Sequence, residues 1–133
     1  MADWVPVAGS TFLVPSGPSG YHLHVVLNDP CVFDGYGPVC CVVMVGFTSK
    51  VNGAPYDSAC NLVAGDHPFI NHDSYIAYKY ARVDRIDELE KKVTTKLFIP
   101  REPVSAELLY RIRNGLQSSR FASREMKRLL TNL

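Results

Sequence analysis

The 133-residue sequence contains no apolar run long enough to cross a membrane, and one of the longest, Val39–Phe47, is far shorter than the roughly 20 residues of a transmembrane helix. No basic segment followed by an apolar stretch is found at Met1–Trp4, so we expect no secretory signal, a cytoplasmic location and no membrane partner. Internal repeats and low-complexity segments are also missing. With 47% apolar and 20% charged residues, the composition excludes disordered and collagen-like classes. We therefore predict one globular domain over residues 1–133.

The four cysteines show no C-x-x-C spacing. Adjacent strand residues such as Cys40 and Cys41 point to opposite faces, so a disulfide framework is not expected and buried, reduced thiols are the favoured interpretation. A zinc site would have to recruit His67, His72 or the cysteines, but no second pair of ligands has the short spacing typical of such sites. The sequence thus predicts neither a metal site nor a cofactor.

Basic residues are almost missing from the first part of the chain. Residues 1–78 hold one basic residue, Lys50, and six acidic ones, whereas residues 79–133 hold thirteen basic and seven acidic ones. The two parts therefore carry net charges of −5 and +6. This asymmetry indicates either a polyanionic or acidic partner for the C-terminal part or a solvated basic helix face, and both interpretations remain open.

The first 80 residues have the pattern of short β-strands. The run Cys40–Thr48 is β-branched and nearly continuous, as expected of a central strand covered on both faces. Turn residues separate this run from the other apolar segments. The further strands are predicted at Thr11–Val14, Tyr21–Leu27, Cys60–Ala64 and Ser74–Tyr80.

The last third changes to helical periodicity. From Val104 the apolar residues recur at helical spacing, with Ser105 as the expected N-cap and Gly115 near the end. A second helix is predicted from Ser123, whereas Arg82–Val93 fits a strand end or a short helix. The pattern predicts an α+β fold: a small, strongly curved antiparallel sheet followed by helices over about residues 104–133.

Two histidines stand on one predicted strand. His22 and His24 are two residues apart and therefore share a face of the strand. Such a pair suits acid/base chemistry or metal binding, and it is equally compatible with ordinary surface positions. Thr48, Ser49 and Lys50 follow the central strand, so two hydroxyls and an ammonium group leave the sheet together. This end of the strand is either a phosphate-binding tip or an ordinary polar strand end.

The segment Gly65–Tyr75 is dense in polar side chains. Asp66 could orient His67, and a carboxylate in that position would raise the basicity of the imidazole. Asp73 could do the same for His72. The alternative is a loop whose Asp and Asn side chains bond their own backbone.

The order of these features resembles the MazF/PemK-like toxins of toxin–antitoxin modules. The resemblance covers most of the chain and rests on four segments, Val25–Asp29, Val45–Ser49, Asp73–Ile76 and Val104–Leu109, the last followed by Ile112 and Leu116. It implies an SH3-like barrel, a homodimer, a cognate antitoxin protein as partner and cleavage of single-stranded RNA without metal. The family's catalytic pair is an Arg before a Pro on one strand and a Thr or Ser ending the next long strand. Thr48 matches the hydroxyl, and His22-Leu23 stands at the Arg-Pro position.

From this resemblance we expect the ribose 2′-OH to attack the adjacent phosphorus, with His22 or His24 as base and acid. Thr48 and Lys50 would stabilise the charge on the phosphate. The predicted catalytic residues are His22, His24 and Thr48. The predicted substrate-binding residues are Ser49, Lys50, His67, Lys79 and Arg82.

A rival hypothesis is that the same domain is a non-catalytic, toxin-like module that binds a protein target. A fold does not fix a function, and a relative can keep the fold after losing the site. A metal-dependent enzyme using His22 and His24 is a third hypothesis.

Overall fold

The computed structural model describes residues 6–18, 20–131 and 133 and confirms the predicted α+β fold. Met1–Trp4, on which the prediction about a secretory signal depends, lies outside the described residues. The elements in chain order are β1 (Thr11–Ser16), β2 (Gly20–Val26), β3 (Cys31–Val32), β4 (Cys40–Ser49), β5 (Asn61–Leu62), β6 (Ser74–Ile76), the 3-10 helix η1 (Tyr78–Tyr80), β7 (Arg82–Arg85), α1 (Ile86–Thr94), β8 (Ile99–Arg101), α2 (Ala106–Ser118) and α3 (Arg124–Thr131).

Strand β4 is the centre of the sheet, as its continuous apolar run predicts. It pairs in antiparallel fashion with β2 and β3 along one edge and with β7 and β6 along the other. The sheet order is β5-β6-β4-β2-β1-β8. Within the described residues no pairing joins β8 to β5, so the sheet stays open.

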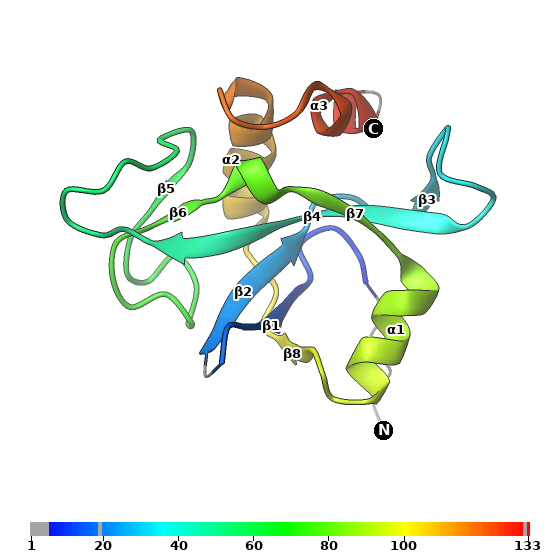
Figure 1. Ribbon diagram of the computed structural model, residues 1–133, viewed down its shortest axis with the longest axis horizontal. Helices are drawn as coiled ribbons and strands as arrows, with labels where there is room; N and C mark the ends of the chain where they lie inside the picture. Colours follow the sequence, from blue (N-terminus) through cyan, green and yellow to red (C-terminus); the bar gives the residue numbers. More distant parts are fainter. Residues whose placement is uncertain (1–5, 19, 132) are drawn as a thin grey trace.

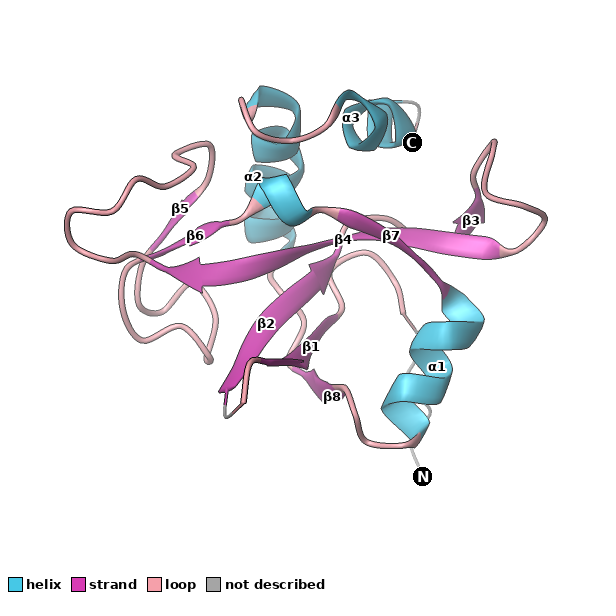
Figure 2. Cartoon of the chain, viewed as in Figure 1, coloured by secondary structure: helices cyan, strands magenta, loops and turns pink. Residues whose placement is uncertain are grey.

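Helices cover the two faces of the sheet unequally (Figures 1 and 2). Because side chains alternate along β4, Val43, Val45 and Phe47 pack on one face, in the same core cluster as residues of α2 and α3. Val42 and Met44 point to the other face and share a smaller cluster with Leu89 of α1. In both figures α1 lies toward one end of this second face, beside β7, and no described helix covers the face near β6.

Serine hydroxyls fix the starts of both C-terminal helices. The side chain of Ser105 accepts a hydrogen bond from the backbone N–H of Leu108 at 3.1 Å, which confirms the predicted N-cap of α2. Ser123 accepts from the N–H of Met126 at 3.2 Å in the same way. Among the helices in the described ranges, none combines the length and the hydropathy of a membrane-spanning segment.

The predicted strand Ser74–Tyr80 is wrong in its second half. The chain leaves the β pairing after Ile76, the N–H of Ala77 donates to the carbonyl of Gly46 at 3.0 Å, and η1 follows. Tyr78 is fully buried there, and its hydroxyl donates to the carbonyl of Ile112 in α2 at 2.6 Å. Tyr78 is one of the aromatic residues on which the strand prediction rested, and in the structure it instead attaches α2 to the sheet through this hydrogen bond. The ambiguous segment Arg82–Val93 contains both alternatives, strand β7 and then helix α1.

We predict that Gly115→Ala lowers the free energy of unfolding by about 1–3 kcal/mol, because the new methyl would overlap the Tyr78 hydroxyl and lie 2.8 Å from its ring carbon Cζ. Helix propensity alone gives the opposite sign, since alanine is favoured over glycine in a helix interior by about 1 kcal/mol. Urea denaturation measures the difference, with the exposed neighbour Asn114→Ala as control. A Gly115→Ala protein as stable as the parent would contradict this packing.

Candidate functional site

The uncovered end of the sheet lies where β4 runs past α1. Gly46 and Thr48 continue the face on which Val42 and Met44 meet α1, because side chains of alternate residues share a face. On the neighbouring strand β2, His24 lies opposite Gly46 in the register. His22, two residues before His24, is exposed. The pleat of the two strands therefore brings predicted catalytic residues to a part of the sheet that α1 leaves open.

A small pocket of about 70 Å³ lies at this end of the sheet. Tyr21 and His22 of β2 line it together with Thr48 and Ser49 of β4. His72, from the segment before β6, completes its polar wall. Three of the predicted site residues, His22, Thr48 and Ser49, are therefore brought together, and a second imidazole joins them.

His72 is held by hydrogen bonds on both ring nitrogens. Its Nε2 pairs with the hydroxyl of Ser49 at 2.5 Å, and its Nδ1 pairs with the side-chain oxygen of Asn71. Since an amide oxygen only accepts, Nδ1 carries the proton and donates it, which leaves Nε2 to accept from the serine. The result is a hydroxyl, an imidazole and an orienting amide in sequence, the arrangement typical of an activated hydroxyl or a general base.

Part of this role of His72 was predictable from the sequence. It placed the residue in a polar loop, with Asp73 as the expected orienting group. The pairing of Ser49 with Ser74, and the bond from the N–H of Lys50 to the carbonyl of Asp73 at 3.1 Å, bring His72 beside the end of β4. In the structure the side chain of Asn71, in place of the expected Asp73, orients the His72 ring. The strand pairing that creates the contact is non-local and is not visible in the spacing of residues.

His24 lies on the same strand but in a different environment. Its ring stacks on Phe12, with centroids 6.4 Å apart, and covers Gly46, where an added Cβ would lie 3.1 Å from Nε2. Burial and the nearby positive charge of Arg82 lower its pKa to about 4, and its Nδ1 is buried without a hydrogen-bond partner. At neutral pH His24 is therefore an uncharged packing residue, outside the lining of the pocket that holds His22.

His67 is also buried, with 2% of its surface exposed. Its Nε2 donates to the carbonyl of Glu102 at 2.6 Å, and its Nδ1 accepts from the N–H of Phe69 at 3.0 Å. Both nitrogens are used in fastening the loop before β6 to the segment before α2. The structure therefore gives His67, predicted as a substrate-binding residue, a tethering position instead.

The three predicted cations, Lys50, Lys79 and Arg82, lie outside the lining of this pocket. The ammonium of Lys50 sits over the ring of Tyr56, 4.5 Å from its centroid, and that of Lys79 lies 5.7 Å from the centroid of Tyr80. Arg82 forms an ion pair with Asp84 at 2.7 Å, which offsets its charge. Lys50 and Lys79 are therefore the predicted cations best suited to meet an anionic ligand.

No protein-family model, curated protein or solved structure matches the chain. In the described part of the chain, no group of three or more His, Cys, Asp or Glu side chains is arranged to hold a metal ion. The residues that line the pocket carry two imidazoles, the hydroxyls of Thr48, Ser49 and Ser74 and the phenol of Tyr21.

The lowered pKa of His24 predicts an acid-sensitive fold. In the unfolded chain His24 binds a proton near pH 6.5, and in the folded chain it does so only near pH 4. The stabilisation that neutral His24 contributes to the fold is therefore complete above about pH 6.5 and is lost as the pH falls toward 4. The loss amounts to about 3 kcal/mol. Urea denaturation at several pH values measures it. His24→Phe should flatten the curve between pH 6.5 and 4, and an unchanged slope in that variant would contradict the assignment.

Proposed function

We propose that this protein is an endoribonuclease that cleaves single-stranded RNA without a metal ion. The observation that carries the proposal is that His22, Thr48, Ser49 and His72 line one pocket, in which the Ser49 hydroxyl is hydrogen-bonded to the His72 ring. Cleavage of RNA through its 2′-hydroxyl needs a base, an acid and donors to the phosphate. The pocket offers each of these groups.

In this mechanism His72 is the general base. Its Nε2 accepts the proton of the ribose 2′-OH, displacing the hydroxyl of Ser49, while Asn71 holds the ring. The 2′-oxygen attacks the adjacent phosphorus and the bond to the 5′-oxygen breaks. His22 in its protonated form supplies the proton that the leaving oxygen takes up. The products are a 2′,3′-cyclic phosphate and a free 5′-hydroxyl.

The hydroxyls and the ammonium stabilise the charge that develops on phosphorus. Thr48 and Ser49 stand at the end of β4 as hydrogen-bond donors, and Lys50 follows them directly. Donors fixed by a strand before the reaction need little rearrangement in the transition state. This division of labour assigns no proton transfer to His24, whose low pKa keeps it neutral where RNA is stable.

We further propose that the protein is a MazF/PemK-like toxin that acts as a homodimer and is neutralised by a cognate antitoxin. The open antiparallel sheet would then correspond to the SH3-like barrel of that family. Thr48 stands at the family's hydroxyl position, and His22 stands in place of its arginine. An imidazole provides acid/base chemistry but no permanent bidentate charge for phosphate, so Lys50 has to supply the cation.

A cleavage assay with purified protein, single-stranded RNA and a chelator tests the activity. We expect cleavage by the parent protein and a loss of about 10²- to 10⁴-fold in His22→Ala and in His72→Ala, because each removes one proton-transfer group. His24→Phe, measured at pH 7, should cleave at nearly the parental rate. Lys91→Ala, exposed on α1, is the surface control.

The pattern of losses decides among the hypotheses. A large loss in His24→Phe with full activity in His72→Ala would restore the assignment to His22 and His24. Cleavage that needs an added metal would point to a metal-dependent enzyme. A parent protein that leaves RNA intact would contradict the proposal and favour a non-catalytic module that binds a protein target.

A further inference from the structure

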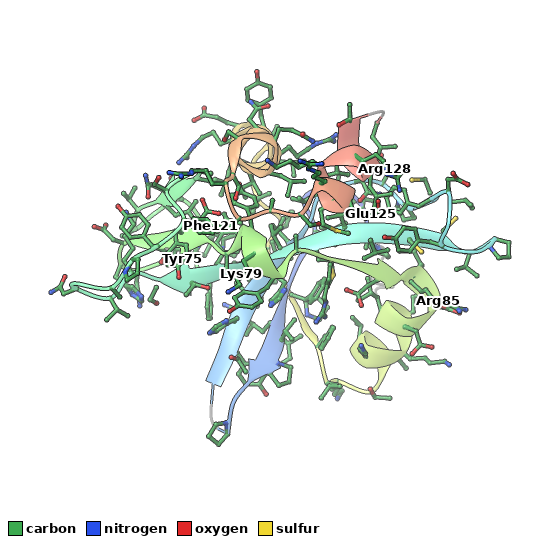
Figure 3. All side chains as sticks on the ribbon, turned by 45° about the horizontal axis from the view of Figure 1, so that its top comes forward. Tyr75, Lys79, Arg85, Phe121, Glu125 and Arg128 are labelled. Carbon is green, nitrogen blue, oxygen red and sulfur yellow. The ribbon has the colours of Figure 1, made fainter. Side chains whose placement is uncertain are left out.

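The pocket lined by His22 and His72 is called the reaction pocket here. A second hollow, of about 250 Å³, lies beside it. Its walls carry five aromatic side chains and an ammonium group, contributed by the loop after β4, by β6, by η1 and by the link between α2 and α3. Tyr75 connects the two hollows, because it is the cross-strand partner of Thr48 in the pairing of β4 with β6. Figure 3 shows Tyr75, Lys79 and Phe121 close together on one side of the molecule.

Three of the five aromatic side chains that line this hollow are open to solvent. Tyr80 is 71% exposed, Phe121 is 57% exposed and Tyr56 is 42% exposed. The rings of Tyr56 and Tyr75 lie 5.5 Å apart at an angle of 43°. Large apolar side chains gathered in one exposed place mark a binding surface more often than an accident of packing. Flat rings in particular suit a flat ligand.

Hydrogen bonds hold the walls of the hollow in place. The carboxylate of Asp57 accepts from the hydroxyl of Ser119 at 2.6 Å and from the N–H of Ala59 at 3.0 Å. The Ser119 oxygen in turn accepts from the N–H of Phe121 at 3.0 Å. The loop carrying Tyr56 and the link carrying Phe121 are thus fastened to each other through a buried bond. The aromatic surfaces are preformed, which lowers the entropy lost on binding.

The rim of the hollow carries positive charge. The ammonium groups of Lys50 and Lys79 lie over the rings of Tyr56 and Tyr80. The Asp57 carboxylate also lines the hollow, and the two ammonium groups outnumber it. Aromatic faces flanked by ammonium groups complement a ligand with flat rings and phosphates. Unpaired nucleotides have both, whereas the bases of a duplex are stacked on each other and hidden from such a surface.

We propose that this hollow binds an unpaired base of the RNA, adjacent to the phosphate held in the reaction pocket. The base stacks on Tyr80 and Phe121, a flanking phosphate meets Lys79, and Lys50 remains with the reacting phosphate. This inference rests on the proposed function and deepens it, since it adds a base-binding subsite beside the pocket of His22 and His72. Stacking accepts every base, so the hollow selects for single strands more than for sequence.

Binding of a fluorescently labelled single-stranded DNA octamer, followed by anisotropy, tests the hollow separately from catalysis, because DNA lacks the 2′-hydroxyl. We expect Tyr80→Ala and Phe121→Ala each to weaken binding about 10-fold, the loss of one stacked base. Tyr80→Phe should bind like the parent, because it keeps the ring. The matched control is Tyr110→Ala on α2, an aromatic residue 69% exposed outside the hollow. Circular dichroism checks the fold of each variant.

The outcomes separate this inference from the proposed function. If binding depends on Tyr80 and Phe121 but the protein does not cleave RNA, the result would support base binding in the hollow and contradict the proposed nuclease activity. If the protein cleaves RNA but both alanine variants bind the octamer as the parent does, the result would support the nuclease activity and contradict base binding in the hollow. An equal loss in Tyr110→Ala, or equally tight binding of the same octamer as a duplex, would also overturn it.

Discussion

Strand β4 is covered on both faces along only part of its length, and this partial cover positions both the core and the pocket. From Cys41 to Val45 the strand is buried on both faces, between the C-terminal helices and the cluster under α1. Burial on two faces requires apolar side chains, and that stretch of the strand supplies them. At Thr48 and Ser49 the cover ends, and hydroxyls replace methyl groups. The same strand therefore anchors the core and presents the polar groups of the pocket at a fixed position.

The four histidines show how this geometry sorts one residue type into two roles. His24 and His67 lie in the interior, where one packs against Phe12 and the other bonds two backbone groups. His22 and His72 are exposed and meet at the reaction pocket. The two interior rings are used in packing and tethering, whereas the two exposed rings are open to a ligand. Solvent access, more than position along the chain, separates the two candidates for catalysis from the two structural rings.

Local signals predicted much of the fold and only part of the site. The run Cys40–Thr48 and the N-cap Ser105 were identified correctly because each depends on near neighbours in the chain. The turn of Tyr78 into the core depends on a hydrogen bond to Ile112, 34 residues away, and an aromatic-rich segment does not reveal it. The role proposed for His72 likewise needs the pairing of β4 with β6. The alternation of side chains along a strand correctly placed His22 and His24 on one face. It does not reveal which of the two is exposed to solvent.

The central claim is that the pocket of His22 and His72 cuts RNA by activating a 2′-hydroxyl. Its most direct test is an oligodeoxynucleotide containing one ribonucleotide, incubated with the protein and a chelator, with the products identified by mass spectrometry. We expect a single cut after the ribonucleotide, leaving a 2′,3′-cyclic phosphate and a 5′-hydroxyl. An intact oligonucleotide, or equal cutting of the all-deoxy strand, would contradict it.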